Sequence, residues 1–190
     1  MDSHNPDDQV ERFKAWWENY GNALIAGVLI GAGLLGGINY WRHHKAEQAA
    51  AASQVYDRML TAVQQRRVAD AGREGEQLMQ DYARTPYAGK AALILARVRW
   101  EAGEADSARQ ALEWAAEHAD DATRHAARLH LARLLLHAGE IDAAARLAET
   151  RDPGGFAADY ADLRGDVLVA QGDRAAARAA YREALERSSA

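Results

Sequence analysis

The longest apolar block of the chain covers residues 19–41 and contains no Asp, Glu, Lys or Arg. As an α-helix, these 23 residues rise roughly 34 Å, enough to cross a hydrocarbon core of about 30 Å. Aromatic rings, which favour the headgroup level, flank the block: Trp16 and Trp17 precede it, and Tyr40 and Trp41 end it. The pattern predicts a single transmembrane helix.

Other interpretations of this block do not fit its surroundings. A signal peptide begins with basic residues, whereas residues 1–11 contain four acidic side chains and no Lys or Arg. A buried helix of a soluble core rarely stays uncharged for so long. Gly31, Gly33 and Gly36 spell the G-x-G-x-x-G of a dinucleotide site, with Asp57 downstream. No later segment supplies the further strands that such a site needs, so we expect no cofactor here.

Small residues recur inside the block at helical spacing. Gly27 and Gly31 are four residues apart, as are Gly33 and Gly37. This spacing lets the backbones of two membrane helices approach closely, so these glycines are candidates for packing against a partner helix. The alternative is that they are lipid-facing, because glycine is common in membrane helices.

The segments on either side of the block define three parts of the chain. Residues 1–8 are polar and acidic, and residues 9–18 follow with apolar side chains at helical spacing, which predicts an amphipathic lead-in at the membrane surface. We therefore expect an N-terminal segment over residues 1–18, a transmembrane helix over 19–41, and one folded domain over 42–190.

Beyond the block, every segment has the length and composition of a helix, and none alternates like a strand. Short breaks containing Gly, Pro or Asp separate the segments, and Pro86 marks a first helical turn. The fold class predicted is all-α, with no β-sheet and at least six helices after the span. The expected helices cover residues 46–67, 70–82, 86–101, 104–118, 120–137, 140–150, 156–170 and 174–187.

These segments repeat at intervals of 36 and then 33 residues, as Ala96, Ala132 and Gly165 show. Each copy contains a small residue in its first helix and then a Gly followed by an acid, which suit a tight turn and a helix N-terminus. Such a unit of two helices resembles the tetratricopeptide repeat and predicts a helical-repeat solenoid. The middle copy departs from the pattern, with Ala148 where a large residue is usual and Arg151 where a small one is.

Charge and chemistry narrow the function. The net charge is −5 and no basic stretch stands out, so nucleic acid is not an expected partner. The chain has no cysteine, and its seven histidines are never three or four residues apart, so we expect no metal site and histidines at the surface. No catalytic constellation or nucleotide motif is present, so we expect neither an enzyme nor a small-molecule substrate.

The inner face of a repeat solenoid is its usual binding surface. Aligning the repeats gives candidate positions for a groove that holds an extended segment of another protein. The alternative is a solvated helix face, with Trp100 in the core. The candidates are Arg97, Trp100, Arg133, His137, Asp162 and Asp166, together with Lys90, Leu93, Leu129 and Asp159.

Over residues 9–187, the chain resembles the YfgM family. The resemblance rests on the Trp16-Trp17 lead-in, the Gly-rich span, and the ending with Gly165, Gly172-Asp173 and Tyr181. It implies a bitopic protein of the bacterial inner membrane with a periplasmic tetratricopeptide-like domain. It further implies an ancillary subunit of the SecYEG translocon that associates with a PpiD-like membrane-anchored chaperone and helps to hand secreted or outer-membrane proteins to periplasmic chaperones. The alternatives are a scaffold or assembly factor of another envelope complex, or a membrane-tethered enzyme.

Flanking charge alone does not set the orientation of the span. Residues 9–18 contain Arg12 and Lys14, and residues 42–51 contain Arg42 and Lys45, so the basic residues are balanced. Long domains translocate largely regardless of charge, and the family resemblance places the large domain in the periplasm. We therefore expect a cytoplasmic N-terminus and residues 46–190 in the periplasm.

Overall fold

The computed structural model describes residues 6–189, and within the first helix it describes the side chains of residues 17, 31 and 33 onward. In this part of the chain all regular structure is helical, which confirms the all-α prediction. One 3-10 turn, η1, covers Gly154–Phe156. The α-helices are α1 (Pro6–Gln64), α2 (Val68–Asp81), α3 (Pro86–Glu101), α4 (Ala105–His118), α5 (Asp121–His137), α6 (Ile141–Ala148), α7 (Ala157–Ala170) and α8 (Arg174–Ser188).

The chain divides into two compact units, Met1–Glu47 and Gln48–Ala190, and α1 is continuous across the boundary. Within the described residues, no helix combines the length and the apolar character needed to cross a membrane. The structure does not describe the side chains of residues 19–30 and 32 of the predicted span. Gly27 is among these residues, so its predicted packing role lies outside the described part. A Cβ added to Gly31, Gly33 or Gly37 would meet no atom within 4 Å.

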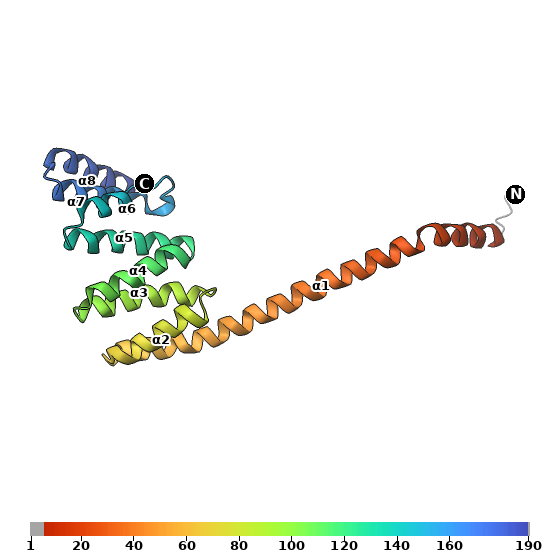
Figure 1. Cartoon of the computed structure of the whole chain (residues 1–190). Helices are drawn as coiled ribbons and strands as arrows, with labels where there is room; N and C mark the ends of the chain where they lie inside the picture. Colours follow the sequence, from red (N-terminus) through yellow and green to blue (C-terminus); the bar gives the residue numbers. More distant parts are fainter. Residues whose placement is uncertain (1–5, 190) are drawn as a thin grey trace. The chain divides into compact units, whose positions relative to one another are not determined.

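In the second unit, helices pack against their neighbours in chain order (Figure 1). The C-terminal part of α1 packs on α2, where Arg58 donates a 3.1 Å hydrogen bond to Glu74 and Met59 lies against Gly75. Contacts then follow from α2 to α3 and onward to α8, and α3 and α5 also touch. This stack is the repeat solenoid that the sequence predicts.

The same turn joins the two helices of three successive pairs. Gly103, Gly139 and Gly172 have φ angles of 81°, 79° and 86°, which favour glycine. The amide of the acidic residue after each glycine donates to the carbonyl five residues earlier, as from Glu104 to Arg99 at 2.8 Å. This pattern is the Schellman motif, which satisfies carbonyls at the end of the first helix.

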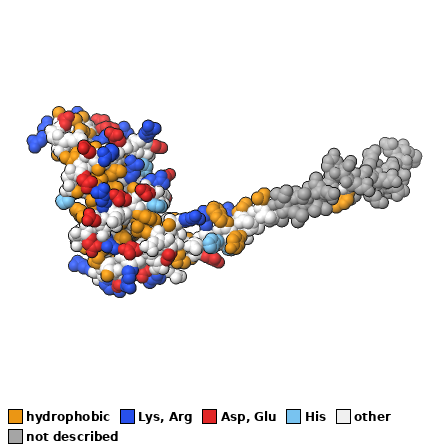
Figure 2. Space-filling view, viewed as in Figure 1, with side chains coloured by type: hydrophobic (Ala, Val, Ile, Leu, Met, Phe, Trp, Pro, Cys, Tyr) orange, Lys and Arg blue, Asp and Glu red, His pale blue; other side chains and the backbone are white. Residues whose placement is uncertain are grey.

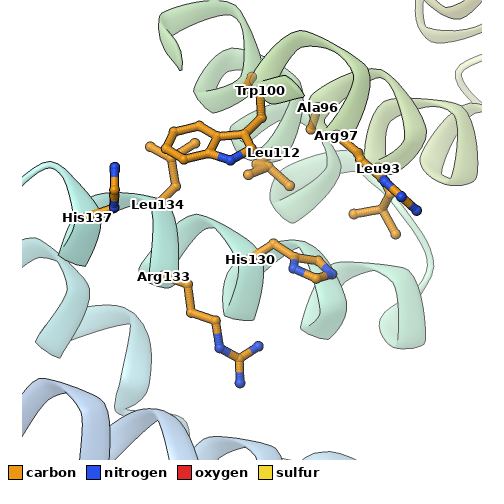
Figure 3. Close-up of a pocket in the computed structure, with 10 residues that line it drawn as sticks. Leu93, Ala96, Arg97, Trp100, Leu112, His130, Arg133, Leu134 and His137 are labelled. Carbon is orange, nitrogen blue, oxygen red and sulfur yellow. The ribbon is translucent and has the colours of Figure 1, made fainter. Parts of the chain in front are cut away.

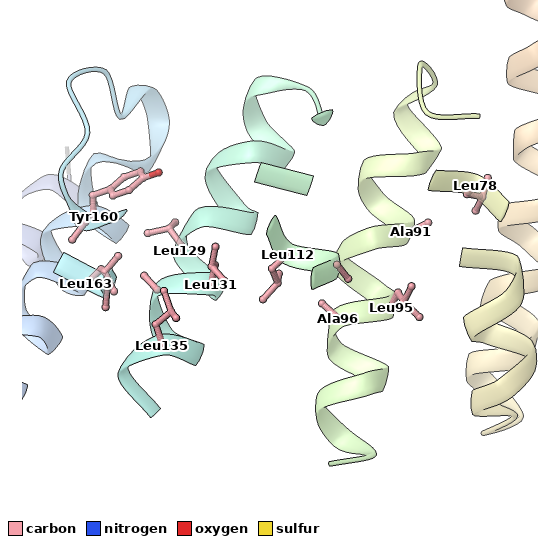
Figure 4. Packing of buried hydrophobic residues seen from close by; sticks show 14 of the residues in the cluster. Leu78, Ala91, Leu95, Ala96, Leu112, Leu129, Leu131, Leu135, Tyr160 and Leu163 are labelled. Atoms are coloured by element: carbon pink, nitrogen blue, oxygen red, sulfur yellow. The ribbon is translucent and has the colours of Figure 1, made fainter. Parts of the chain in front are cut away.

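A continuous apolar core runs through the stack (Figure 4). It is built mainly from Ala and Leu, so the helices lie close together, and Tyr160 and Met59 are its largest fully buried side chains. Burial of apolar surface from water is the main force that holds such a stack together. The labelled core side chains of α2–α7 are Leu78, Ala91, Leu95, Ala96, Leu112, Leu129, Leu131, Leu135, Tyr160 and Leu163.

Two glycines mark the closest helix contacts. A Cβ added to Gly89 in α3 would lie 2.7 Å from the Cβ of Ala119, and one added to Gly165 in α7 would overlap the ring of Tyr181 in α8. The Tyr181 hydroxyl donates a 2.8 Å hydrogen bond to Asp166, so the ring is held against α7 at Gly165. Burial and this hydrogen bond to the Asp166 carboxylate raise the pKa of Tyr181 to about 12.

The middle repeat has a shortened second helix. Helix α6 has 8 residues and ends at Ala148, whereas α4 has 14 and α8 has 15. The sequence-based helix over residues 140–150 is therefore too long at its C-terminal end. The small Ala148 gives the end of α6 little side chain to bury, and Pro153 then favours a turn.

The exposed surface of the second unit mixes the two signs of charge, as its visible face shows (Figure 2). Several ion pairs link helices within a repeat or between repeats. Arg99 contacts Glu76 at 2.5 Å and Glu104 at 2.8 Å, and Arg109 contacts Glu140 at 2.9 Å. These pairs are partly solvated, so each contributes little to stability.

We expect Gly165→Ala to destabilise the protein by about 1–3 kcal/mol, because the added methyl group overpacks the contact with Tyr181. Thermal unfolding of the full chain in detergent, followed by circular dichroism, measures this as a midpoint lower by several degrees.

The matched control is Gly155→Ala, where an added Cβ meets no atom within 4 Å and the midpoint should not fall. Adding Tyr181→Leu to Gly165→Ala should recover part of the loss. Equal midpoints for the Gly165 and Gly155 variants would contradict this packing argument.

Candidate functional site

A pocket of about 520 Å³ opens between α3 and α5, with α4 at its base. Its volume falls within the range of roughly 300–1,000 Å³ that is typical of ligand sites. The lining residues are Leu93, Ala96, Arg97, Trp100, Ala108, Leu112, His130, Arg133, Leu134 and His137.

Helical spacing explains why these side chains meet. Leu93, Ala96, Arg97 and Trp100 lie three, four and seven residues apart, so they share one face of α3. On α5 the same spacing brings His130, Arg133, Leu134 and His137 to one face. Ala108 and Leu112 of α4 are buried and form the apolar base. Two first helices and one second helix of neighbouring repeats therefore build the pocket.

Trp100 and His137 lie together at one end of the pocket, whereas Leu93 and Arg97 lie toward the other (Figure 3). The two rings meet edge to face, with centroids 5.1 Å apart and planes at 83°. Trp100 remains 42% exposed, so the interpretation that places it in the core is wrong. An exposed Trp beside partly buried leucines offers apolar surface to a ligand.

The two arginines of the pocket already contact carboxylates. Arg97 donates a 2.8 Å hydrogen bond to Glu101, one turn further along α3. Arg133 points away from Trp100 in Figure 3 and contacts Asp162 at 3.3 Å and Asp166 at 4.0 Å. The acidic side chains of α7 therefore lie beside Arg133.

The structure brings some of the predicted groove residues together and separates others. Five of them, Leu93, Arg97, Trp100, Arg133 and His137, line the pocket. Leu129 lies in the hydrophobic core, and Lys90 is exposed outside the pocket. Asp159 and Asp162 line a second hollow between α7 and α8, next to Tyr181, and Asp166 accepts the Tyr181 hydroxyl. The binding role of these residues stays a prediction.

Repeat alignment missed His130. It equates Leu93 with Leu129, because the repeats are offset by 36 residues. However, α3 lines the pocket with the face that it turns toward α5, whereas α5 uses the face that it turns back toward α3. Equivalence therefore does not decide which positions line it: Arg97 and its equivalent Arg133 both do, whereas Ile94, the equivalent of His130, does not. The signal that finds His130 is its spacing of seven residues from His137 along α5.

His130 is accessible from one side, yet the pocket partly desolvates its ring. Desolvation, and then the positive charge of Arg133, lower the pKa of His130. Both causes oppose the imidazolium form. At neutral pH the pocket therefore presents two arginines and a neutral His130.

The expectation that the histidines lie at the surface does not hold fully for His125. His125 is partly buried, its Nδ1 lies 2.9 Å from the hydroxyl of Tyr160, and its ring stacks on Phe156. This contact ties α5 to the start of α7. No group of three or more His, Cys, Asp or Glu in the described part of the chain could hold a metal ion.

Comparison with known proteins gives consistent matches over nearly the whole chain. A family model described as a tetratricopeptide repeat-like domain matches residues 14–190. A protein of Escherichia coli (strain K12), named ancillary SecYEG translocon subunit, is 33% identical over 178 residues, which are 93% of this chain and 85% of its own length. Two proteins with the same name are 30% identical in Haemophilus influenzae and 28% identical in Aggregatibacter actinomycetemcomitans, over 96% and 97% of this chain and 90% of each relative.

We expect the free energy of unfolding, relative to that of His130→Gln, to rise with pH between about 5 and 7.5. The folded-state pKa of His130 lies below its unfolded value, so the unfolded chain binds more protons in this range. The difference in free energy of unfolding is largest at pH values above the pKa of His130 in the unfolded chain. It decreases as the pH falls through the pKa of His130 in the folded chain. Urea denaturation of the full chain in detergent at several pH values measures the difference.

Arg133→Gln should weaken this pH dependence, because it removes the second cause of the shift. A difference between the unsubstituted chain and His130→Gln that does not change with pH would contradict the prediction.

Proposed function

We propose that this chain is a membrane-anchored protein-binding module of the Sec translocon. It belongs to the YfgM family of ancillary SecYEG translocon subunits, which have a tetratricopeptide repeat-like domain. The observation that carries the proposal is the match to three proteins of that name over 93–97% of the chain. The role is protein binding rather than catalysis, and it involves neither nucleic acid nor a small-molecule substrate.

The anchor of the proposed module is the helix over residues 19–41. This assignment is supported by the uncharged apolar sequence of the segment and by the exposure of the side chains that the structure describes at its C-terminal end. Leu34, Leu35 and Ile38 are 63%, 71% and 51% exposed, which suits contact with lipid. The Lys45 ammonium lies 3.7 Å from the ring centroid of Trp41, a pairing suited to the membrane surface.

The repeat domain is the part of the proposed module that contacts other proteins. Solenoids bind partners on the surface that their first helices line, and the pocket between α3 and α5 lies there. We place this domain in the periplasm, next to the translocon and a PpiD-like membrane-anchored chaperone. There it would receive secreted or outer-membrane proteins and help to pass them to periplasmic chaperones.

Co-purification tests the translocon association. SecYEG should co-purify with the full chain from detergent-solubilised inner membranes. Gly27→Leu with Gly31→Leu should reduce the recovered SecYEG at least about threefold while membrane insertion stays normal, because the leucines separate closely packed helices. The control is Leu34→Ile, which keeps an exposed apolar side chain.

The same purification with Gly33→Leu and Gly37→Leu tests the second glycine pair. Unchanged recovery with both pairs would assign these glycines to lipid and end the packing hypothesis. Failure of SecYEG to co-purify with the unsubstituted chain would end the proposed function itself.

Topology is tested by reporters fused after Ala190. A reporter that is active only in the periplasm should work there, and a cytoplasmic reporter at the same position should stay silent, because the long domain translocates. The opposite result would invert the topology and remove the periplasmic role with it.

A further inference from the structure

The pocket between α3 and α5 has a charge character opposite to that of the chain. The whole sequence has a net charge of −5. Yet the pocket lining contains Arg97, His130, Arg133 and His137 and no Asp or Glu among the described residues. The hollow between α7 and α8 shows the reverse, with Asp159 and Asp162 in its lining and no basic residue. Basic groups are therefore concentrated locally at the pocket.

The arginines of the pocket are available to a new partner. The contact of Arg97 with Glu101 joins two exposed side chains on one helix, and such pairs are weak in water. Arg133 lies 3.3 Å from Asp162 and 4.0 Å from Asp166, and Asp166 also accepts the Tyr181 hydroxyl. The Arg133 contacts are long for charge-assisted hydrogen bonds, and the Arg97 contact is exposed to solvent, so a carboxylate in the pocket can compete for both guanidinium groups.

Between the basic groups the pocket is apolar. Trp100 is 42% exposed, and Leu93 and Leu134 are only partly buried. Below them, the small side chains of Ala96 and Ala108 leave the depth for an inserted side chain. A volume of about 520 Å³ accommodates a bulky apolar side chain with its neighbouring residues.

We infer that the pocket binds a peptide segment in which a bulky apolar side chain is followed directly by an acidic one. The apolar side chain fills the space beside Trp100, and the carboxylate reaches Arg97 and His130 at the rim, where it competes with Asp162 for Arg133. This inference rests on the proposed protein-binding function and specifies the chemistry of the segment that the module recognises.

Binding of such a segment is linked to proton uptake. A carboxylate beside His130 favours the imidazolium form, against the desolvation and the Arg133 charge that lower its pKa in the free protein. The affinity for an acidic segment therefore rises as pH falls. The charged or titratable groups that share the pocket with His130 are Arg97 on α3 and Arg133 and His137 on α5. The arginines in turn contact Glu101 on α3 and Asp162 and Asp166 on α7.

The experiment uses four fluorescent peptides of twelve residues with one Gly/Ser host sequence. Their central pairs are Phe-Glu, Phe-Gln, Phe-Lys and Ala-Glu. Titrated with the full chain in detergent micelles at pH 7, Phe-Glu should bind at least about tenfold more tightly than each of the others, because the pocket recognises both parts of the pair. Its affinity should be higher at pH 6 than at pH 8.

Substitutions locate the binding site. Arg97→Gln should remove most of the preference for Phe-Glu over Phe-Gln, and Trp100→Leu should weaken both peptides. His130→Gln should remove the pH dependence, and Arg133→Lys tests the second guanidinium with its charge retained. The matched control is Arg178→Gln, since Arg178 is exposed on α8 outside the pocket. Equal thermal midpoints verify that each variant is folded.

Three results would overturn the inference. One is equal affinity for Phe-Glu and Phe-Gln, and another is binding that Arg97→Gln and Trp100→Leu leave unchanged. The third is no binding of any peptide at millimolar concentration. If SecYEG still co-purifies with the chain, each of these results removes the inference and leaves the proposed function standing.

Discussion

The repeat domain depends on the close approach of the two helices in each pair. The first helices of three pairs carry small residues at equivalent positions, Ala96, Ala132 and Gly165. In the last pair the fit is tightest, because the ring of Tyr181 occupies the space where a Cβ of Gly165 would lie. In the middle pair the corresponding residue of the second helix is Ala148, and there α6 ends. Close packing in each pair thus depends on complementary side-chain volumes.

The candidate pocket is formed by the same kind of small side chain that lets the helices pack closely. Ala96 and Ala108 are buried and also line the pocket, so the small residues that bring α3 and α4 together leave a space beside α5. Long basic side chains then surround this space, because they occur on the exposed edges of α3 and α5. The binding surface is a product of helix packing, and it needs no loop or inserted segment.

Much of the fold could be predicted from the sequence, because glycine followed by an acid marks a turn that few other residues can form. The ends of α3, α5 and α7 lie where Gly103, Gly139 and Gly172 place them. The pocket was less predictable, since a repeat alignment shows which positions are equivalent but not which face of a helix meets its neighbour. His130 was missed for this reason. The ion pair of Arg133 with Asp162 depends on two helices that only the folded stack brings together.

The order of contacts in the stack has a consequence for synthesis. Each helix from α2 to α8 packs on the helices next to it in the sequence, and among the described residues the main longer contacts reach from α3 to α5 and from α5 to α7. Chains with such local contacts fold quickly, because few long loops must close. In the described part of the chain, α8 packs mainly on its neighbour α7 rather than on an earlier pair. Helix pairs can therefore form one after another while the rest of the polypeptide is still emerging.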